Sequence, residues 1–325
     1  MFLQEVSLKI RKNKILYYIK NFLRQAVPTV FHESALPKKL SSLDKFDKNY
    51  VIERVNYYNK LNNHSTLTDH QSISLKKMIT IKSPKAYRFD TFEYTRYFKK
   101  DLKASFLFGD ITTVSEYPTI QKSRPVAGNN TNAILLNLDK KRHFFFINDH
   151  KQFLEKKNIL IGRAVITQPH RMSFMEMYFN HRMCDVGQVN TKGGNLKWLK
   201  PRMSIVEHLD YKFILSLEGN DVATNLKWIM SSNSIAVLRK PVYETWFMEG
   251  RLIPDFHYIL IKDDYSDLEE RLSYFINHPE EAQSIVNNAH QYIKQFSNQE
   301  QEDLISLLVL EKYFYYTSQT NKLSI

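Results

Sequence analysis

The sequence predicts an α/β protein with parallel sheets and two domains. Candidate strands and helices alternate through both halves of the chain, which is the pattern of βαβ units. The length of 325 residues exceeds the usual size of one hydrophobic core. A stretch at 213–232 runs from a short apolar segment through a glycine turn into helical spacing. We expect a first domain over 1–150, a second over 151–300, and a C-terminal helix over 301–325 that packs on the first domain.

The charge and cysteine content narrow the class of protein. The chain carries 46 Lys and Arg against 34 Asp and Glu, a net charge of +12. We therefore expect an anionic partner: nucleic acid, an anionic membrane surface or a phosphate-bearing small molecule. Cys184 is the only cysteine, which excludes an internal disulfide and a cysteine zinc cluster. No apolar run reaches the ~20 residues of a membrane span, and the N-terminus lacks a signal-peptide pattern, so a cytoplasmic protein is expected.

Residues 1–25 form a basic amphipathic segment. One helical face is apolar, with Phe2, Val6, Ile10, Ile15, Ile19, Phe22 and Leu23. Lys9, Arg11, Lys12, Lys14, Lys20 and Arg24 oppose a single acid, Glu5. Such a helix fits an anionic membrane surface, and an ordinary surface helix of a basic protein fits the same pattern. Residues 26–75 are expected to be loops between short helices, with one helix around 51–61.

The first candidate site residue is Asp110. Residues 76–110 are aromatic and β-like, and they end in the run Ala104–Phe108, which Gly109 and Asp110 follow. A carboxylate just past the carboxyl end of an apolar strand is where α/β folds place functional residues. Many turn aspartates occupy the same kind of position, so this pattern alone leaves both interpretations open. Because glycine is scarce in this chain, Gly109 is expected to have a positive φ or a close backbone approach.

The rest of the first domain is predicted to alternate between loop and strand. The loop after Asp110 carries two cations, Lys122 and Arg124. Strands are expected at 133–138 and 142–149, and a helix around 150–157 leads into the second domain.

The second domain begins with a candidate phosphate-binding segment. A strand over 159–161 meets Gly162 and Arg163, and Arg171 follows shortly after. Two arginines near a strand end could hold a diphosphate through paired hydrogen bonds, and surface salt bridges are the alternative. The later elements are expected to be strands at 235–238 and 257–261, and helices that begin at a capping-box pattern in 266–269, near Pro279, and at about 302.

The stretch 213–232 lies at the centre of this domain. A strand over 213–217 breaks at 218–221, and a helix follows, with Asn220 or Asp221 as the expected N-cap. A strand, a glycine turn and a helix start form a common anion site, because free N–H groups and the helix dipole point at the loop. An ordinary βα unit with a capped helix is the alternative.

Several familiar motifs are absent from the sequence. It has no GxxxxGK[ST] phosphate loop, no GxGxxG dinucleotide fingerprint, no HExxH, no CxxC and no GxSxG elbow. It also has no D-x-D pair and no two glutamates eight positions apart. No RNA-binding or zinc-finger pattern is present, and the aromatic residues occur in core-like runs, so nucleic acid is not the expected partner.

Seven segments resemble glycosyltransferase family 90 in sequence and in order. They are GDITTVSEYPTIQKSRP, RHFFFIND, the GRA segment with Arg171, CDVG, SLEGNDVATNLKW, YETWFMEGRLIP, and HYILIKDDYSDLEE followed by PEEAQ. The resemblance runs from about Phe106 to Phe296. The residues of these segments are more similar to those of the bacterial members, which build lipopolysaccharide cores. Residues 1–105 match only weakly.

The resemblance implies a GT-B-like fold, with two Rossmann-like domains that face a central cleft, and inverting chemistry without a metal or other cofactor. It implies Asp110 as the general base. The donor-binding positions that it implies are Gly162, Arg163, Arg171, Glu218, Gly219, Asp221, Thr224, Asn225 and Lys227. Possible substrate contacts are Lys122, Arg124 and Glu244. Where the family often has Arg-Gly, this chain has Gly162-Arg163.

These observations predict an inverting glycosyltransferase that moves a hexose or pentose from a nucleotide-diphosphate sugar, with UDP-sugars first, to a lipopolysaccharide core or related glycan. A carboxylate can take the proton of the acceptor hydroxyl, and cations with N–H donors can stabilise the departing diphosphate. The expected partners are the donor, a lipid-linked glycan and an anionic membrane surface, on the inner face of the bacterial cytoplasmic membrane. The alternative is a non-enzymatic basic protein that binds nucleic acid or a membrane surface.

Overall fold

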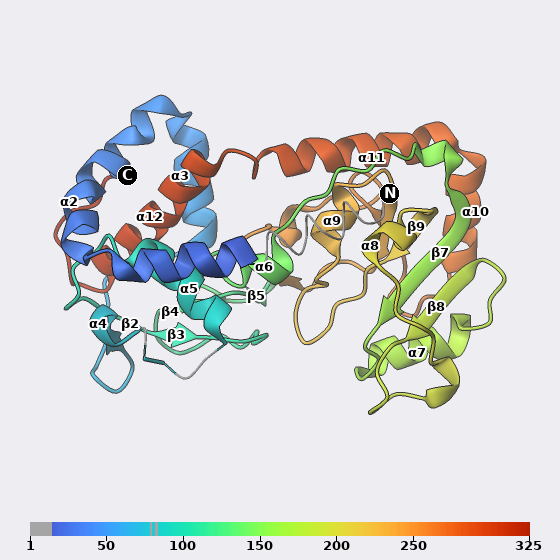
Figure 1. Cartoon of the computed structure of the whole chain (residues 1–325), viewed down its shortest axis with the longest axis horizontal. Coiled ribbons are helices and arrows are strands. Elements are labelled where there is room, and N and C mark those ends of the chain that lie inside the picture. The colour runs from blue at the N-terminus through green and yellow to red at the C-terminus, as the bar shows by residue number, and fades with distance from the viewer. Residues whose placement is uncertain (1–14, 79, 82–83) are drawn as a thin grey trace. The chain divides into compact units, whose positions relative to one another are not determined.

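A computed structural model describes residues 15–78, 80–81 and 84–325, which form two compact units (Figure 1). Unit 1 contains the described residues up to Phe144, together with Val242–Met248 and Phe296–Ile325. Unit 2 contains Phe145–Pro241 and Glu249–Gln295. Both units mix helices with parallel strands, so the predicted α/β class is confirmed.

Unit 1 combines a small parallel sheet with a group of helices. Residues 15–26 are helical, and the other helices are α2 (Thr29–Leu40), α3 (Lys48–Tyr58), α4 (Leu75–Met78), α5 (Lys85–Thr95), α6 (Lys140–His143) and α12 (Gln299–Tyr316). The parallel sheet has the order β3 (Phe106–Leu107), β4 (Thr119–Gln121) and β6 (Ala133–Leu135). Two antiparallel pairs accompany it: β1 (Ile73–Ser74) with β2 (Lys103–Ala104), and β5 (Arg124–Pro125) with β11 (Tyr243–Glu244).

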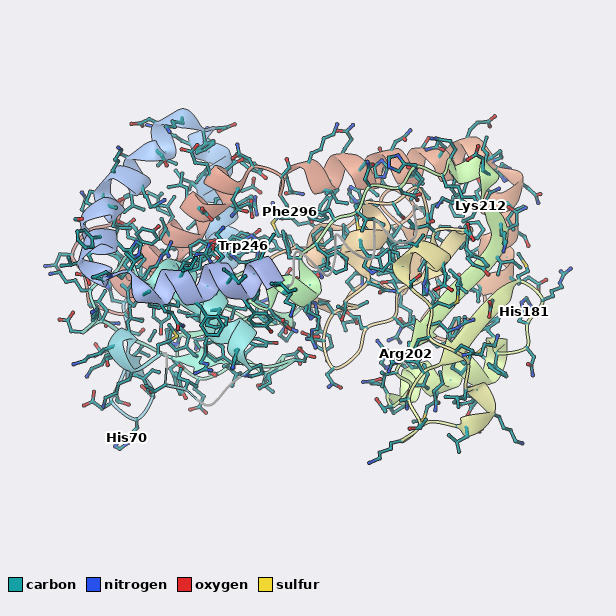
Figure 2. All side chains as sticks on the ribbon, in the orientation of Figure 1. His70, His181, Arg202, Lys212, Trp246 and Phe296 are labelled. Carbon is teal, nitrogen blue, oxygen red and sulfur yellow. The ribbon has the colours of Figure 1, made fainter. Side chains whose placement is uncertain are left out.

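The core of unit 1 is closed by its last helix. Helix α12 lies against α3 and α5, and it brings Glu302 to Arg54, a guanidinium with no exposed side-chain surface (Figure 1). The indole of Trp246 donates to Glu302 at 2.6 Å and stacks on Tyr58 at 3.8 Å between ring centroids. The Arg54 guanidinium also lies over the rings of Trp246 and Phe296, both labelled in Figure 2. A buried charge is tolerated here because it is paired and hydrogen-bonded.

Unit 2 is a doubly wound parallel sheet. Its strands are β7 (Lys157–Ala164), β8 (Cys184–Gln188), β9 (Tyr211–Leu215), β10 (Ile235–Leu238) and β12 (Ile259–Leu260), in the spatial order β12-β10-β9-β7-β8. Its helices are α7 (Pro169–Tyr178), α8 (Ile205–His208), α9 (Leu226–Met230), α10 (Leu268–Asn277) and α11 (Pro279–Lys294). Read along the chain this is the flavodoxin-like order, whose direction of winding reverses between the first strand, β7, and the third, β9. Ligands of such sheets bind outside the carboxyl ends of the strands at that switch point.

The prediction for α11 is confirmed in detail. The helix begins at Pro279, and the apolar face that its spacing indicates, Ala282, Ile285, Val286, Ala289 and Ile293, is buried. The expected strands at 159–161, 213–217, 235–238 and 257–261 coincide with β7, β9, β10 and β12.

Two predictions for the first half are wrong. The segment expected to be β-like contains α5, because its buried residues, which include Tyr87, Asp90 and Tyr94, recur every three to four positions. The strand expected at 142–149 is replaced by α6 and an irregular segment, in which the Ile147 N–H donates to the Ser231 hydroxyl at 2.9 Å and not to a neighbouring strand.

Three helix predictions further along the chain are also wrong. The helix expected at 150–157 is a 3-10 turn over Phe153–Glu155, because Lys157 already belongs to β7. The N-cap of α9 is Asn225, not Asn220 or Asp221, since the break after β9 runs several residues further. Helix α10 begins at Leu268 without a capping box; the Ser266 hydroxyl donates to the Asp264 carboxylate at 2.8 Å.

Candidate active site

Asp110 lies just beyond β3 in unit 1, on a turn that Gly109 makes with a φ of +137°. A side chain at that position would be strained, so the expected positive φ at Gly109 is confirmed. The Oδ1 atom of Asp110 accepts hydrogen bonds from the Lys122 ammonium, the Arg142 guanidinium and, at 3.2 Å, the Tyr87 hydroxyl. Three donors, from α5, from α6 and from the loop between β4 and β5, therefore fix one oxygen of this carboxylate.

The second oxygen of Asp110, Oδ2, is not held by these three donors. Within the described part of the chain no hydrogen bond reaches Oδ2, and 30% of the side chain is exposed. Burial raises the pKa of Asp110, but the hydrogen bonds from Lys122 and Arg142 outweigh it and hold the pKa below its ordinary value. The carboxylate is therefore ionised at neutral pH, with one oxygen anchored and one able to accept a proton.

Arg142, Tyr87 and Asp139 belong to this site, although the sequence did not indicate them. Arg142 bridges two carboxylates, because its Nε also lies 2.8 Å from Oδ2 of Asp139. Asp139 is the N-cap of α6 and Arg142 lies within this helix, where the expected strand 142–149 was to begin. The signal that could have found them is the run of charged residues at 139–142, which would be unusual inside a buried strand.

Lys122, one of the possible substrate contacts, is part of the Asp110 site. Its side chain is 2% exposed, and its ammonium also lies 3.2 Å from Nε2 of His143. Lys122 therefore acts on Asp110 from below the surface and presents little of itself to a substrate.

Arg124 and Glu244, the other two possible contacts, form a buried ion pair instead. The guanidinium of Arg124 binds the Glu244 carboxylate at 2.8 Å, and it also donates to the carbonyls of Tyr57, Tyr58 and Ala133. Both side chains are almost completely inaccessible, at 0% and 3% exposed. This pair joins β5, β11, β6 and the end of α3, so its evident role is structural.

In unit 2, Arg171 spans the switch point of the sheet. It lies in the first turn of α7 and donates to three backbone carbonyls: Val165 beyond β7 at 2.8 Å, and Leu217 and Glu218 beyond β9 at 2.7 and 2.9 Å. His170 adds a 2.8 Å contact from Nε2 to the same Glu218 carbonyl. The side chain that was predicted to hold a phosphate thus also fixes the two loops between which a ligand of this fold would lie.

The loop from 216 to 225 is ordered by short-range contacts. Gly219 lies against Arg171, because a Cβ at Gly219 would stand 3.3 Å from the guanidinium. Asn225 donates to the Leu215 carbonyl at 2.9 Å and accepts from the Ser216 hydroxyl at 3.0 Å, which ties the loop end to β9. Asp221 is buried and its carbonyl accepts from the Gly219 N–H, whereas Thr224 is exposed. Glu218, Gly219, Thr224 and Asn225 are therefore together at the carboxyl edge of the sheet.

Arg163 and Lys227 point away from that loop. The Arg163 guanidinium binds Asp185 and the carbonyls of Gly162 and Pro201, and its side chain is 8% exposed. Lys227 forms an ion pair with Glu249 in which each side chain is 1% exposed. Gly162 has no positive φ; a Cβ there would lie 3.1 Å from that of Leu215, so it permits close strand packing.

Two further observations concern metals and membranes. In the described ranges, no group of three or more His, Cys, Asp or Glu side chains is arranged to hold a metal ion. Across the same residues, no helix is both long and apolar enough to cross a bilayer.

A doubly wound sheet with an organised switch point and a partly exposed carboxylate held by cations fit a sugar-transferring enzyme, and comparison with known proteins agrees that this chain is a glycosyltransferase. The model of the family described as glycosyl transferase family 90 matches residues 148–313. The chain belongs to this family, because the match covers half of it and a relative of similar length covers nearly all of it. The alternative of a non-enzymatic basic binding protein is therefore not retained.

The relatives differ in how much of the chain they cover. The O-glucosyltransferase LpsA of Dichelobacter nodosus is 39% identical over 305 residues, which are 93% of this chain and 95% of that protein. The protein O-glucosyltransferase 2 of Danio rerio is 27% identical over 96 residues, 30% of this chain and 19% of that protein.

Proposed function

We propose that the chain is an inverting glycosyltransferase that uses a nucleotide-diphosphate sugar, with UDP-sugars as the first candidates, and that Asp110 is its general base. The observation that carries the proposal is the asymmetry of the Asp110 carboxylate: Oδ1 is held by three donors, and Oδ2 belongs to a side chain that is 30% exposed. A base needs this combination of fixed geometry and one accessible oxygen.

The proposed reaction is a single displacement. Oδ2 of Asp110 takes the proton of the acceptor hydroxyl while the acceptor oxygen forms a bond to C1 of the sugar. The bond between C1 and the diphosphate oxygen breaks at the same time, and the electron pair leaves with the nucleoside diphosphate. Attack from the face opposite the leaving group inverts the configuration at C1.

We place the donor at the switch point of unit 2. The loops that Arg171 ties together, and the residues Glu218, Gly219, Thr224 and Asn225 at the sheet edge, are where doubly wound folds bind nucleotides. In the GT-B arrangement that the family resemblance implies, unit 1 carries the acceptor side and unit 2 the donor side. Charge on the leaving diphosphate is then stabilised by arginine and backbone N–H groups, and the proposal requires no metal.

We infer that glucose is the transferred sugar and a lipopolysaccharide core, or a related lipid-linked glycan, the acceptor. The name of the Dichelobacter nodosus relative supports glucose, since it is an O-glucosyltransferase. The likeness of the sequence motifs to bacterial members of the family supports the acceptor. Such an acceptor places the enzyme on the inner face of the bacterial cytoplasmic membrane.

The surface of unit 1 formed by residues 15–31 supports membrane attachment. Its large apolar side chains are each between 40% and 66% exposed: Ile15, Leu16, Ile19, Phe22, Leu23, Val27, Val30 and Phe31. The helix over residues 15–26 meets the rest of unit 1 through polar and aromatic side chains: Tyr17 donates to Asp90 at 2.7 Å, Arg24 pairs with Glu93, and the rings of Tyr17, Tyr18 and Phe22 lie against Phe89. The large aliphatic side chains of the helix nevertheless remain exposed, whereas an ordinary surface helix buries its apolar face.

An anionic bilayer is the occupant that we propose for this apolar surface. The first 25 residues carry six Lys and Arg against one acid. Arg24 is paired with Glu93, and each of the other cations that lies near an anionic surface contributes roughly 1 kcal/mol. The sedimentation of the full chain with phosphatidylglycerol vesicles tests this proposal. The double variant Leu16→Ser and Leu23→Ser should lose binding, whereas Leu196→Ser, which removes a similarly exposed side chain in unit 2, should retain it. Equal pelleting of all three proteins would refute the surface, and concentration-dependent scattering without lipid would point to self-association instead.

The central experiment is to incubate the purified chain with UDP-glucose, other UDP-sugars and GDP-sugars and with core oligosaccharide isolated from a strain that lacks this gene. We expect one added hexose and, from an α-linked donor, a β-linkage in the NMR spectrum of the product. An α-linkage would refute the inverting displacement. Transfer from none of these donors would refute the proposed function.

A further inference from the structure

The proposed donor site leaves open which cation meets the diphosphate, because the arginines and lysine expected there are bound to the protein itself. Arg163 is held by the Asp185 carboxylate and three carbonyls, Arg171 by three carbonyls, and Lys227 by buried Glu249. Each is mostly satisfied by the fold before a ligand arrives. A leaving diphosphate nevertheless needs positive charge that is available to it.

Arg239 is a cation in a different situation. It is the first residue past the carboxyl end of β10, the strand next to β9 in the sheet. Among the described residues its guanidinium forms no hydrogen bond, and its one ion pair is loose, with 3.9 Å between Nη1 and Oδ1 of Asp263. Asp263 is 88% exposed, so this contact is weak and easily exchanged for another anion.

The surroundings of Arg239 orient it toward the switch point. Its guanidinium lies 5.5 Å from the ring centroid of Tyr265, whose hydroxyl donates to the His170 carbonyl at 2.9 Å. His170 in turn contacts the Glu218 carbonyl in the loop beyond β9. Burial, helped by the charges of Arg239 and Arg171, keeps the pKa of His170 below its ordinary value. The imidazole of His170 therefore lies within electrostatic range of both guanidinium groups, and it is neutral at pH 7.

We infer that Arg239 is the guanidinium that binds the diphosphate of the nucleotide-sugar donor, while Arg171 positions the loops around it. This inference rests on the proposed function and adds to it a binding residue that neither the sequence motifs nor the family resemblance indicated. The side chain of Arg239 is 22% exposed, its one ion pair is weak, and its guanidinium packs over the Tyr265 ring. It can therefore present two N–H groups to phosphate oxygens. The charge that builds up on those oxygens during transfer would strengthen the contact.

The test compares ligands that differ only in the diphosphate. Isothermal titration of the full chain with UDP, GDP and CDP identifies the nucleoside diphosphate that binds, and the matching nucleoside serves as the probe without phosphate. Arg239→Gln should weaken binding of the diphosphate by about 10- to 100-fold, the loss expected for a hydrogen bond to a charged group, and leave nucleoside binding unchanged. Arg239→Lys should bind the diphosphate with an affinity between those of Arg239→Gln and the unchanged protein, since it keeps the charge but loses the paired N–H donors of the guanidinium.

Arg182→Gln is the matched control. Arg182 precedes β8 at the opposite, amino-terminal edge of the sheet, is 80% exposed and pairs with Glu269, so its loss should not affect either ligand. If Arg239→Gln binds the diphosphate as tightly as the unchanged chain, the inference fails and the proposed function stands. Equal loss of diphosphate and nucleoside would also overturn the inference, because it would indicate a disturbed loop. If the unchanged chain binds none of the three diphosphates, the proposed function fails as well.

Discussion

The Asp110 site of unit 1 and the Lys227–Glu249 pair of unit 2 are chemically alike but differ in access to solvent. In both, a carboxylate accepts a hydrogen bond from a lysine that is at most 2% exposed. The carboxylate of Glu249 is 1% exposed, whereas that of Asp110 is 30% exposed and has one oxygen without a hydrogen bond among the described residues. The comparison teaches that the exposure of the carboxylate side chain, and not the presence of paired charges, separates a candidate catalytic group from an ion pair of the core.

The pair Arg124–Glu244 resembles Lys227–Glu249, because both are buried ion pairs. Its carboxylate is 3% exposed, and its guanidinium is occupied by three backbone carbonyls. Removing one partner of such a pair leaves a buried charge alone, which is expensive, so these residues should affect stability before they affect chemistry.

The largest expected effect tests the exposed member of the comparison. Asp110→Asn removes the proton-accepting oxygen but keeps the shape, so transfer should fall by about 10²- to 10⁴-fold, the usual contribution of a general base. Donor binding and the melting temperature should remain close to those of the unchanged chain. Initial rates with the donor identified above measure the effect. Asp69→Asn, at an exposed ion pair with Lys103, is the control. Normal turnover by Asp110→Asn would remove the assignment.

The next effect tests the buried member. Lys227→Met should lower the free energy of unfolding by about 3–5 kcal/mol, because it leaves Glu249 buried without its cation. Urea denaturation measures this loss. Adding Glu249→Leu in the same chain should recover part of it, since both charges are then gone. If Lys227→Met keeps the free energy of unfolding of the unchanged chain but no longer binds the donor, Lys227 belongs to the donor site and is not merely part of a core ion pair.

A smaller effect is expected in the pH dependence of transfer. Asp110 must be ionised to accept a proton, so the rate falls as the pH drops through its pKa, which Lys122 and Arg142 hold below the ordinary value. Arg142→Gln removes one of these two hydrogen bonds. The pKa should therefore rise, and the acidic limb of the pH–rate profile should move to higher pH. Lys45→Gln, which removes a charge from an exposed ion pair, should leave the limb in place, and a limb unmoved by Arg142→Gln would argue against Asp110 as the titrating group.

The smallest expected effect is the response to chelation. In the proposed reaction the diphosphate is stabilised by guanidinium and N–H groups alone. EDTA should then leave the initial rate unchanged. Loss of activity that Mn²⁺ or Mg²⁺ restores would show that this description of the donor site is incomplete.

The parts of the site that the sequence predicted are those that depend on short stretches of chain. Asp110 was chosen as a candidate because an apolar run, a glycine and a carboxylate are consecutive, and the 216–225 loop because a strand, a glycine and a helix follow one another. Helix α11 was predicted down to its buried face for the same reason, since its spacing is repeated over several turns.

The partners of the charged residues could not be predicted. Arg124 meets Glu244 across 120 positions, and Arg142 meets Asp110 across 32, distances along the chain that no local pattern reports. Arg163 and Lys227 were read as donor ligands because their companions Asp185 and Glu249 become visible only when the sheet is assembled. Arg239 was passed over because a single cation after a strand carries no motif.

Unit 1 is built from three separate stretches of the chain, so it cannot fold completely until the last stretch has been synthesised. The guanidinium of Arg54 pairs with Glu302, which is synthesised 248 positions later. Trp246 and Phe296, whose rings lie against that guanidinium, also follow Arg54 by many residues. At about 5–20 residues per second, the ribosome needs from over ten seconds to nearly a minute to supply them. Residues 145–241 of unit 2 emerge as one uninterrupted piece in that interval. We expect the second half of the molecule to acquire structure first, and the N-terminal helices to remain exposed to chaperones until the last helix leaves the exit tunnel.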